Sequence, residues 1–280
     1  MKIRISADST CDLDPGYIRR HEITMLPLTV SMGGRNYVDG VDIVPDDIFR
    51  HVEAGGDLPK TAAVNVADYR ATFEKLLRDC DAVIHFNISA EFSSCHEHAV
   101  AAAQGLPVYC VDSRNLSSGI ALLVCEAVDK IEAGCDDPRA VVEHVTGLID
   151  KVDASFILDR LDYLYKGGRC SMVAMLGANV LKLKPCIEVV DGRMIVGRKF
   201  RGSYSRCLKQ YVDDRLRDPD RVNAKRIFIT HTGVSREDFE LTKAAVLAHM
   251  SFGEVLEVRA GCSITSHCGQ GTLGILFIRN

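Results

Sequence analysis

The sequence has no excess of basic residues and no long apolar run. Lys and Arg number 34 and Asp and Glu number 38 among 280 residues, which gives a net charge of -4. A mildly acidic chain without a basic block argues against nucleic acid as a partner. The longest apolar stretch, Gly119 to Val128, contains Glu126 and is well short of the ~20 residues of a membrane helix. We expect no integral membrane segment, although transient contact with a membrane surface is compatible with this composition.

The chain also shows no export signal and no paired cysteine motif. It begins Met-Lys-Ile-Arg-Ile and leads directly into a strand pattern, so no signal peptide is expected. Its 11 cysteines include no C-x-x-C pair, which is typical of thiols in a reducing cytoplasm. Neither of its two Cys/His groups has the spacing of a structural zinc site. These groups are Cys95 with His96 and His98, and Cys262 with His267 and Cys268. We expect a cytoplasmic protein without a bound metal.

Several common catalytic motifs are missing. No Walker A sequence, G-x-S-x-G or H-E-x-x-H occurs. Gly269 to Gly274 matches G-x-G-x-x-G, but a strand-like run follows it where a dinucleotide site needs a helix. We expect these glycines to let a loop pass close to a ligand or to another domain. The sequence predicts no cofactor and no complete catalytic set.

The first 153 residues alternate between strand and helix patterns. This alternation predicts an α/β domain with a mainly parallel sheet and helices on both faces. Asp14-Pro15 is a typical helix start, with Asp as N-cap and Pro as the first helical residue. A hairpin around Gly33-Gly34 is expected at the edge of the sheet. The predicted helices cover Val66–Arg78, Ser94–Gln104, Ser117–Glu132 and Arg139–Lys151.

From Ala154 the pattern changes to α+β. Asp191-Gly192 separates two strand-like runs and predicts a hairpin. No linker-like composition marks the boundary, so we expect two closely packed domains, residues 1–153 and 154–280. Helices are expected at Asp159–Tyr165, Ser171–Leu181, Tyr204–Arg217 and Ser235–His249, and strands at Pro185–Val190, Met194–Phe200, Arg226–His231, Glu254–Arg259 and Leu273–Ile278. His267 is expected in a loop between the last two strands.

Hydroxyl side chains follow three of the predicted strands. They are Ser9 and Thr10 after the first strand, Ser89 and Ser93 after residues 82–86, and Ser113 and Ser117 after residues 107–111. Ligands of open α/β sheets bind outside the carboxyl ends of the strands, and hydroxyl groups with helix N-termini suit an anion. In any one loop such residues more often serve in turns and caps. Three such loops at one sheet edge favour an anion site.

The pair Ser93-Ser94 precedes one of the predicted helices. Ser94 and Glu97 fit a capping box, in which Ser94 is the N-cap and the Glu97 side chain bonds back to its backbone. The Ser93 hydroxyl would then be available to a ligand. The sequence gives equal weight to the alternative, in which Ser93 itself caps the helix.

Seven short segments, taken in order, resemble the motifs of one known family. They are Asp8–Leu13 (D-S-[TS]-x-D-L), Pro59–Thr61 (P-K-T), Ile88–Ala99 (S-S-x-L-S-G-T), Asp112–Gly119 (D-S-x-x-x-S-x-G), Tyr163–Arg169 (Y-L-x-K-G-G-R), Leu183–Pro185 with Asp191-Gly192 (K-P and D-G), and His267–Gly274 (H-x-G-P-G-x-L-G). The family is DegV, the fatty-acid-binding proteins that serve bacterial fatty acid kinases. Each match is short, but together they run from end to end of the chain.

The resemblance implies that a long-chain fatty acid lies in a tunnel between the two domains. It assigns the carboxylate to Thr61 and Ser93, with His267 nearby. It also implies that a separate fatty acid kinase phosphorylates the bound carboxylate to an acyl phosphate, so this chain would be a carrier and not an enzyme. Further ligand-site residues are expected at Arg169, Ser9, Ser113 and Ser117, and a kinase-docking surface at Arg198 and Arg201.

The chain departs from the family pattern near the expected site. Ala62-Ala63-Val64 replaces S-Q-P, Ser94-Cys95 replaces G-T, and Gln270 replaces a proline. These changes leave the preferred acyl chain length open. Two other functions compete with the carrier. A serine hydrolase would use Ser93 or Ser113 with His267, but the missing nucleophile elbow argues against it. A sensor of another amphiphilic small molecule is the third hypothesis.

Overall fold

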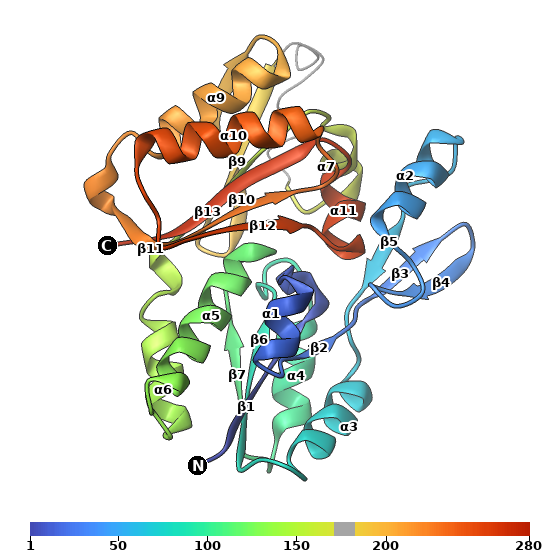
Figure 1. The fold of residues 1–280 in the computed structure, drawn as a ribbon. Helices are drawn as coiled ribbons and strands as arrows, with labels where there is room; N and C mark the ends of the chain where they lie inside the picture. Colours follow the sequence, from blue (N-terminus) through green and yellow to red (C-terminus); the bar gives the residue numbers. More distant parts are fainter. Residues whose placement is uncertain (171–182) are drawn as a thin grey trace.

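The N-terminal half contains a parallel sheet flanked by helices. A computed structural model describes residues 1–170 and 183–280. The sheet consists of β1 (Ile3–Asp8), β2 (Thr24–Leu26), β6 (Ala82–Asn87) and β7 (Val108–Asp112), in the order β2-β1-β6-β7. Its helices are η1 (Ser9–Cys11), α1 (Pro15–Arg20), α3 (Val66–Leu76), α4 (Cys95–Ala103), α5 (Ser118–Glu132), α6 (Pro138–Thr146) and η2 (Ile149–Lys151). All strand pairs are parallel, and α3 with α4 and α5 with α6 cover opposite faces (Figure 1). The predicted fold class of this half is confirmed.

A small antiparallel sheet projects from this half. It consists of β3 (Thr29–Met32), β4 (Arg35–Val38) and β5 (Lys60–Ala62), and α2 (Pro45–Glu53) follows β4. The hairpin expected around Gly33-Gly34 is therefore present, but the prediction that it lies at the edge of the parallel sheet is wrong. Pro27 separates β2 from β3 and cannot donate a ladder hydrogen bond. The chain leaves the first sheet there, and β3 pairs with β5 so that Val30 lies opposite Thr61.

The C-terminal half is built on a mixed six-stranded sheet. Its strands are β8 (Val152–Leu158), β9 (Leu183–Val190), β10 (Arg193–Arg201), β11 (Val222–His231), β12 (Glu254–Arg259) and β13 (Thr272–Arg279), in the order β10-β9-β8-β13-β11-β12. Its helices are α7 (Asp162–Gly167), α9 (Tyr204–Arg215), η4 (Pro219–Arg221), α10 (Arg236–His249) and α11 (Cys262–Cys268). Among the described strands of this sheet, only β11 and β12 pair in parallel. The expected helix Ser171–Leu181 lies outside the described residues.

Two turns in this half show how local sequence sets the backbone. Asp191 and Gly192 join β9 to β10, and both have positive φ (51° and 77°), as a type I′ turn requires. The expected hairpin is confirmed. The loop expected around His267 is wrong, because residues 262–268 form the short helix α11 between Gly261 and Gly269. Seven residues are too few to show a clear helical period.

Helix α5 lies between the parallel sheet and the six-stranded sheet and packs against both halves of the molecule. It packs against β1 and β6 on one side and against β8, β11 and β13 on the other. All its residues from Ser118 to Cys125 are buried, which explains the longest apolar run of the sequence. One hydrophobic core cluster extends through both halves and includes Phe86, Leu122 and Leu276. The halves are thus closely packed. The exact domain boundary at residue 153, which falls inside β8, stays a prediction.

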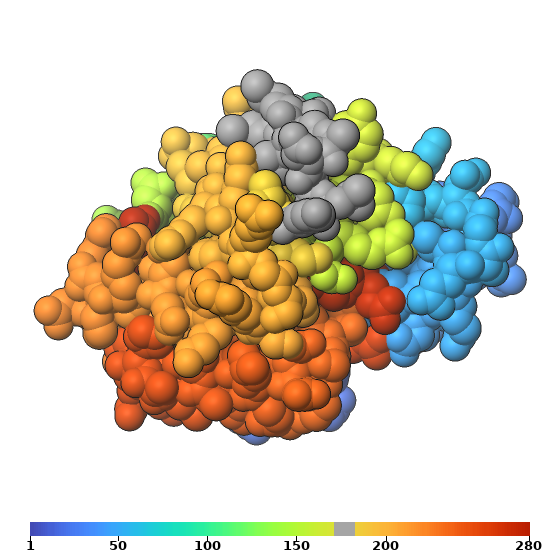
Figure 2. Space-filling view, turned by 90° about the horizontal axis from the view of Figure 1, so that it is seen from above, coloured from blue at the N-terminus to red at the C-terminus, as the bar shows by residue number. Residues whose placement is uncertain are grey.

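On the face of the molecule above the six-stranded sheet, segments that are distant in the sequence lie side by side. Figure 2 shows the region of α2 beside the segment that contains α7, with part of the C-terminal segment between them. Helix α11 contacts both α7 and α2. Within residues 1–170 and 183–280, no helix is long and apolar enough to cross a membrane.

Candidate functional site

A cavity of about 320 Å³ lies between the two halves. The N-terminal half contributes residues of η1 and β5 and of the loops after β6 and β7, and the C-terminal half contributes Arg169, β10 and α11. This volume is at the lower end of the range for small-molecule sites, roughly 300–1,000 Å³. Residues far apart in the sequence therefore form one site of ligand size.

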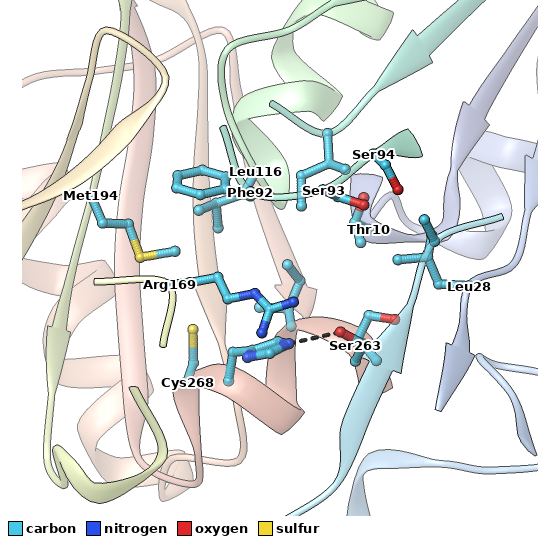
Figure 3. A pocket seen from close by; sticks show the side chains of 15 residues that line it. Thr10, Leu28, Phe92, Ser93, Ser94, Leu116, Arg169, Met194, Ser263 and Cys268 are labelled. Atoms are coloured by element: carbon cyan, nitrogen blue, oxygen red, sulfur yellow. Dashed lines mark hydrogen bonds between the residues drawn. The ribbon is translucent and has the colours of Figure 1, made fainter. Parts of the chain in front are cut away.

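The cavity has a polar side and an apolar side (Figure 3). Hydroxyl groups gather on one side, at Thr10, Ser93 and Ser94. The opposite side carries Phe92, Leu116 and Met194. Such a division suits an amphiphilic molecule, because its polar group can be hydrogen-bonded while its apolar part is removed from water.

Thr61 and His267 come from the two halves and meet in this cavity. Thr61 Oγ1 lies 2.8 Å from His267 Nε2, within hydrogen-bond distance. Burial, together with the nearby charge of Arg169, lowers the pKa of His267 to about 4. The imidazole is therefore neutral at pH 7. Gly167 packs directly against it, since a Cβ on Gly167 would lie 2.7 Å from His267 Nδ1.

The hydrogen bond between neutral His267 and Thr61 can run in either direction. Either Thr61 donates to Nε2, or Nε2–H donates to Thr61 Oγ1. In the second arrangement the Thr61 hydroxyl keeps its own proton for a ligand. An anion in the cavity selects this second arrangement, because a carboxylate oxygen accepts a hydrogen bond more strongly than a neutral group does.

The Ser93 hydroxyl caps α4 and still has a proton to offer. Its Oγ accepts the N–H of Cys95 at 3.3 Å and donates to the Cys95 Sγ at 3.2 Å. A thiol is a weak acceptor, so a carboxylate can compete for this proton. The predicted capping box is wrong, because Ser94 makes no side-chain capping bond. The alternative, with Ser93 as the capping side chain, is the one observed.

Arg169 supplies a positive charge at the edge of the cavity. Its side chain is exposed, and Nη1 donates to the Gly167 carbonyl at 2.8 Å. Since Gly167 also contacts His267, the arginine and the histidine are held by the same turn of chain. Arg169 lines the cavity, and its role in ligand binding stays a prediction.

Three other expected ligand residues have structural partners. Ser9 donates to Asp39 at 2.9 Å, and Ser113 donates to the Asn115 carbonyl at 3.2 Å. Neither lines this cavity or the smaller one beside it. Ser117 lines the smaller cavity but donates to Asp12 at 2.6 Å. Ser113 thus serves in a local turn, whereas Ser9 and Ser117 bond to carboxylates distant in the sequence.

The smaller cavity, of about 30 Å³, lies beside the larger one. Both are lined by Leu116, Ile264 and Cys268. The other walls include residues of β8, β11 and β13. Its hydroxyls are occupied by bonds within the protein, for example between Ser118 and Thr230 at 2.6 Å. The passage therefore presents mainly apolar surface to a ligand.

Two residues of the larger cavity were missed or underrated by sequence reasoning. Ser263 was not singled out, and Thr10 was named only among the hydroxyls that follow the first strand. Both line the cavity, although each is only 2% exposed. Nothing local distinguishes Ser263 from the other hydroxyl residues of α11, since only the packing of the helix turns it toward the cavity.

A buried Ser–His–Asp group lies elsewhere in the N-terminal half. Ser6 Oγ is 2.9 Å from His85 Nδ1, and His85 Nε2 is 3.2 Å from Asp8 Oδ1. All three side chains are fully buried, and Asp8 also accepts bonds from Tyr69 and Asn87. A nucleophile must reach a substrate, so this group is a satisfied core network. In the described parts of the chain, no three His, Cys, Asp or Glu side chains are placed to hold a metal ion.

These features define a two-domain α/β protein with an amphiphilic cavity between its sheets. The chain belongs to the DegV family, because the family model described as an uncharacterised protein of the DegV family matches residues 2–280. A DegV domain-containing protein of Caldanaerobacter subterraneus is 28% identical over 280 residues, which are 99% of this chain and 98% of that protein. The family resemblance seen in the sequence is confirmed.

Solved structures support the same fold and name a ligand class for the relatives. A fatty-acid-binding DegV family protein of Thermus thermophilus is 27% identical, with a TM-score of 0.92 and 100% of both chains covered. A Thermotoga maritima protein, whose structure revealed a fatty acid binding function, is 26% identical with a TM-score of 0.86 and the same coverage. These DegV proteins bind fatty acids.

Proposed function

We propose that the protein binds a long-chain fatty acid, with its carboxylate near Thr61, Ser93 and His267. The observation that carries this proposal is the cavity itself, in which a hydroxyl-lined side faces an apolar passage toward a second cavity. The fatty acid binding of the Thermus and Thermotoga relatives supports it. The acyl chain would run past Leu116 and Ile264 into the passage between the sheets.

The polar side of the cavity can hold a carboxylate with neutral hydroxyl donors, so no charged side chain has to be buried beside the ligand. A buried anion is costly unless donors surround it. Ser93 accepts the N–H of Cys95, and Thr61 can accept from His267 Nε2–H, so that each hydroxyl can donate to the ligand. Arg169 adds attraction from the edge of the cavity, where its own charge stays hydrated.

The acyl chain would provide most of the binding free energy. Each buried methylene contributes roughly 0.8 kcal/mol, so about fifteen methylenes give ~12 kcal/mol before the costs of ordering. The carboxylate then needs only modest stabilisation, and it can lie close to the surface. Ser94 and Arg169, both exposed, line that part of the cavity.

We propose further that a fatty acid kinase acts on the bound carboxylate. Transfer of a phosphoryl group from ATP to the carboxylate would give an acyl phosphate, with the kinase supplying the catalytic groups. Arg198 and Arg201 of the edge strand β10 are the proposed docking residues, and both are exposed. Arg198 is already paired with Asp214 at 2.5 Å, so Arg201 would contribute the less compensated charge.

Extraction of freshly purified protein, followed by mass spectrometry, tests the ligand class. We expect one equivalent of fatty acid. A different amphiphile would favour the sensor hypothesis, and the absence of any lipid, with no binding of palmitate by delipidated protein, would refute the carrier.

Variants test the carboxylate site. The double variant Thr61→Val with Ser93→Ala should bind palmitate at least tenfold more weakly. Ser266→Ala is the matched control, because its hydroxyl bonds to the Cys262 carbonyl within α11. The docking proposal predicts less acyl phosphate from a fatty acid kinase with Arg201→Ala, while palmitate binding is unchanged.

A further inference from the structure

Two buried hydroxyl groups of the cavity have no hydrogen-bond partner. Among the described residues, nothing bonds to Thr10 Oγ1 or to Ser263 Oγ, and each side chain is 2% exposed. Leaving a buried hydroxyl unpaired costs about 1–3 kcal/mol, and native proteins keep few such groups. Both line the same cavity as Thr61 and Ser93. A ligand is the natural partner for them.

We propose that Thr10 and Ser263 are a second pair of hydrogen-bond donors for the ligand's head group and make the site selective for a carboxylate. This inference rests on the proposed fatty acid binding. A carboxylate has two oxygens with about four acceptor positions. Thr61 and Ser93 fill two of them, and Thr10 and Ser263 fill the others. An alcohol of the same chain length has one oxygen and cannot use all four donors.

The two hydroxyls come from opposite halves of the molecule. Thr10 lies in η1, and Ser263 lies in the first turn of α11. They line the same cavity because two buried carboxylates of the N-terminal half hold the start of α11. Asp12 accepts the N–H of Gly261 at 2.7 Å, and Asp39 accepts the N–H of Cys262 at 2.9 Å.

Asp39 also leaves the Ser263 side chain free for a ligand. It accepts the backbone N–H of Ser263 at 3.2 Å, so only the hydroxyl remains unbonded. The other hydroxyl residues of α11 behave differently. Ser266 donates to Cys262 at 2.8 Å and Thr265 to Ala260 at 3.4 Å, which satisfies both inside the helix region. Asp12 and Asp39 are thus positioning residues for this donor pair.

The test compares palmitic acid with 1-hexadecanol on delipidated full-length protein, by displacement of a fluorescent fatty acid. Thr10→Val and Ser263→Ala remove one hydroxyl each. Each should weaken palmitate binding about tenfold, as expected for a bond to a charged group. Hexadecanol binding should change less than threefold. The control Ser266→Ala should leave both affinities unchanged, and Thr10→Ser, which keeps the hydroxyl, should retain wild-type preference for the acid.

The outcomes separate this inference from the proposed function. If wild-type protein does not bind palmitate, the proposed function fails, and this inference fails with it. If wild type binds palmitate but Thr10→Val and Ser263→Ala keep its full affinity, only this inference is overturned. An equal loss for acid and alcohol also overturns it, because that result shows a change of packing. Loss restricted to the acid, with rescue in Thr10→Ser, supports it.

Discussion

The substitution Asp12→Asn should stabilise the protein at neutral and alkaline pH. Asp12 is buried where the two halves meet, with hydrogen bonds from Ser117 and Gly261. Burial raises the pKa of Asp12 from 3.8 to about 7, against the opposing effect of these two bonds, and the nearby Asp39 raises it further. The charged form is thus less favourable in the folded chain than in the unfolded chain.

The sign and size of the effect follow from that pKa. Between pH 4 and pH 7 the folded chain binds more protons at Asp12, so stability falls as the pH rises. Below this window both states are protonated and there is no cost. Above it the full cost applies, which is about 4 kcal/mol for a pKa that moves from 3.8 to about 7. Asparagine cannot ionise, and it can still accept from Gly261 while donating to Ser117.

Urea unfolding of delipidated protein at pH 5 and pH 8 measures the effect. The gain in the free energy of unfolding for Asp12→Asn should be about 2–3 kcal/mol larger at pH 8 than at pH 5. Asp137→Asn is the matched control, because Asp137 is the N-cap of α6, and Asn and Asp cap helices equally well. A gain that is the same at both pH values, or a loss at pH 8, would refute the reasoning.

Three further predictions concern the cavity and the contact between the halves. Gly167→Ala should weaken palmitate binding in titration calorimetry, because the new Cβ would lie 2.7 Å from His267 Nδ1; unchanged affinity would contradict this. In an NMR titration of ligand-free protein, the His267 imidazole should stay neutral from pH 8 down to about pH 5, since its pKa is about 4; titration near 6.5 would show that it is not buried. Arg226→Ala should lower the free energy of unfolding by about 3 kcal/mol in urea, because the buried Arg226 joins β11 to Glu126 and Asp129 of α5; a loss below about 1 kcal/mol would contradict the pairing.

Where the sequence predicted the fold well, the deciding interactions are local. Asp14 caps α1 by accepting the N–H of Tyr17, and Ser235 caps α10 by accepting that of Asp238. Such contacts lie within one turn of helix and can be read from spacing. The β3–β4 hairpin shows the limit of this reasoning. Its turn was predicted from Gly33-Gly34, but its sheet partner β5 is more than twenty residues further along the chain.

The candidate site divides in the same way. Hydroxyls at strand ends and the family motifs led to Thr61, Ser93, His267 and Arg169, all of which line one cavity. The choice between Ser93 and Ser94 as the cap was undecided in the sequence. The backbone decided it, because Ser93 Oγ accepts the first N–H of α4. The role of Thr61, Ser93, His267 and Arg169 in ligand binding stays a proposal, which the extraction and variant experiments test.

The amino-acid sequence alone determined the α/β class, the motifs of the DegV family and the strand-end hydroxyls, since these depend on local periodicity and short spacing. Only the tertiary structure decided which hydroxyls line the cavity. Ser9 and Ser113 lie in the strand-end pattern but bond within the protein, whereas Ser263 lies outside it and lines the cavity. The physical reason is that Ser263 lines the same cavity as Thr10 because Asp12 and Asp39 hold α11 across the junction of the two halves, and contacts between such distant segments leave no trace in local spacing.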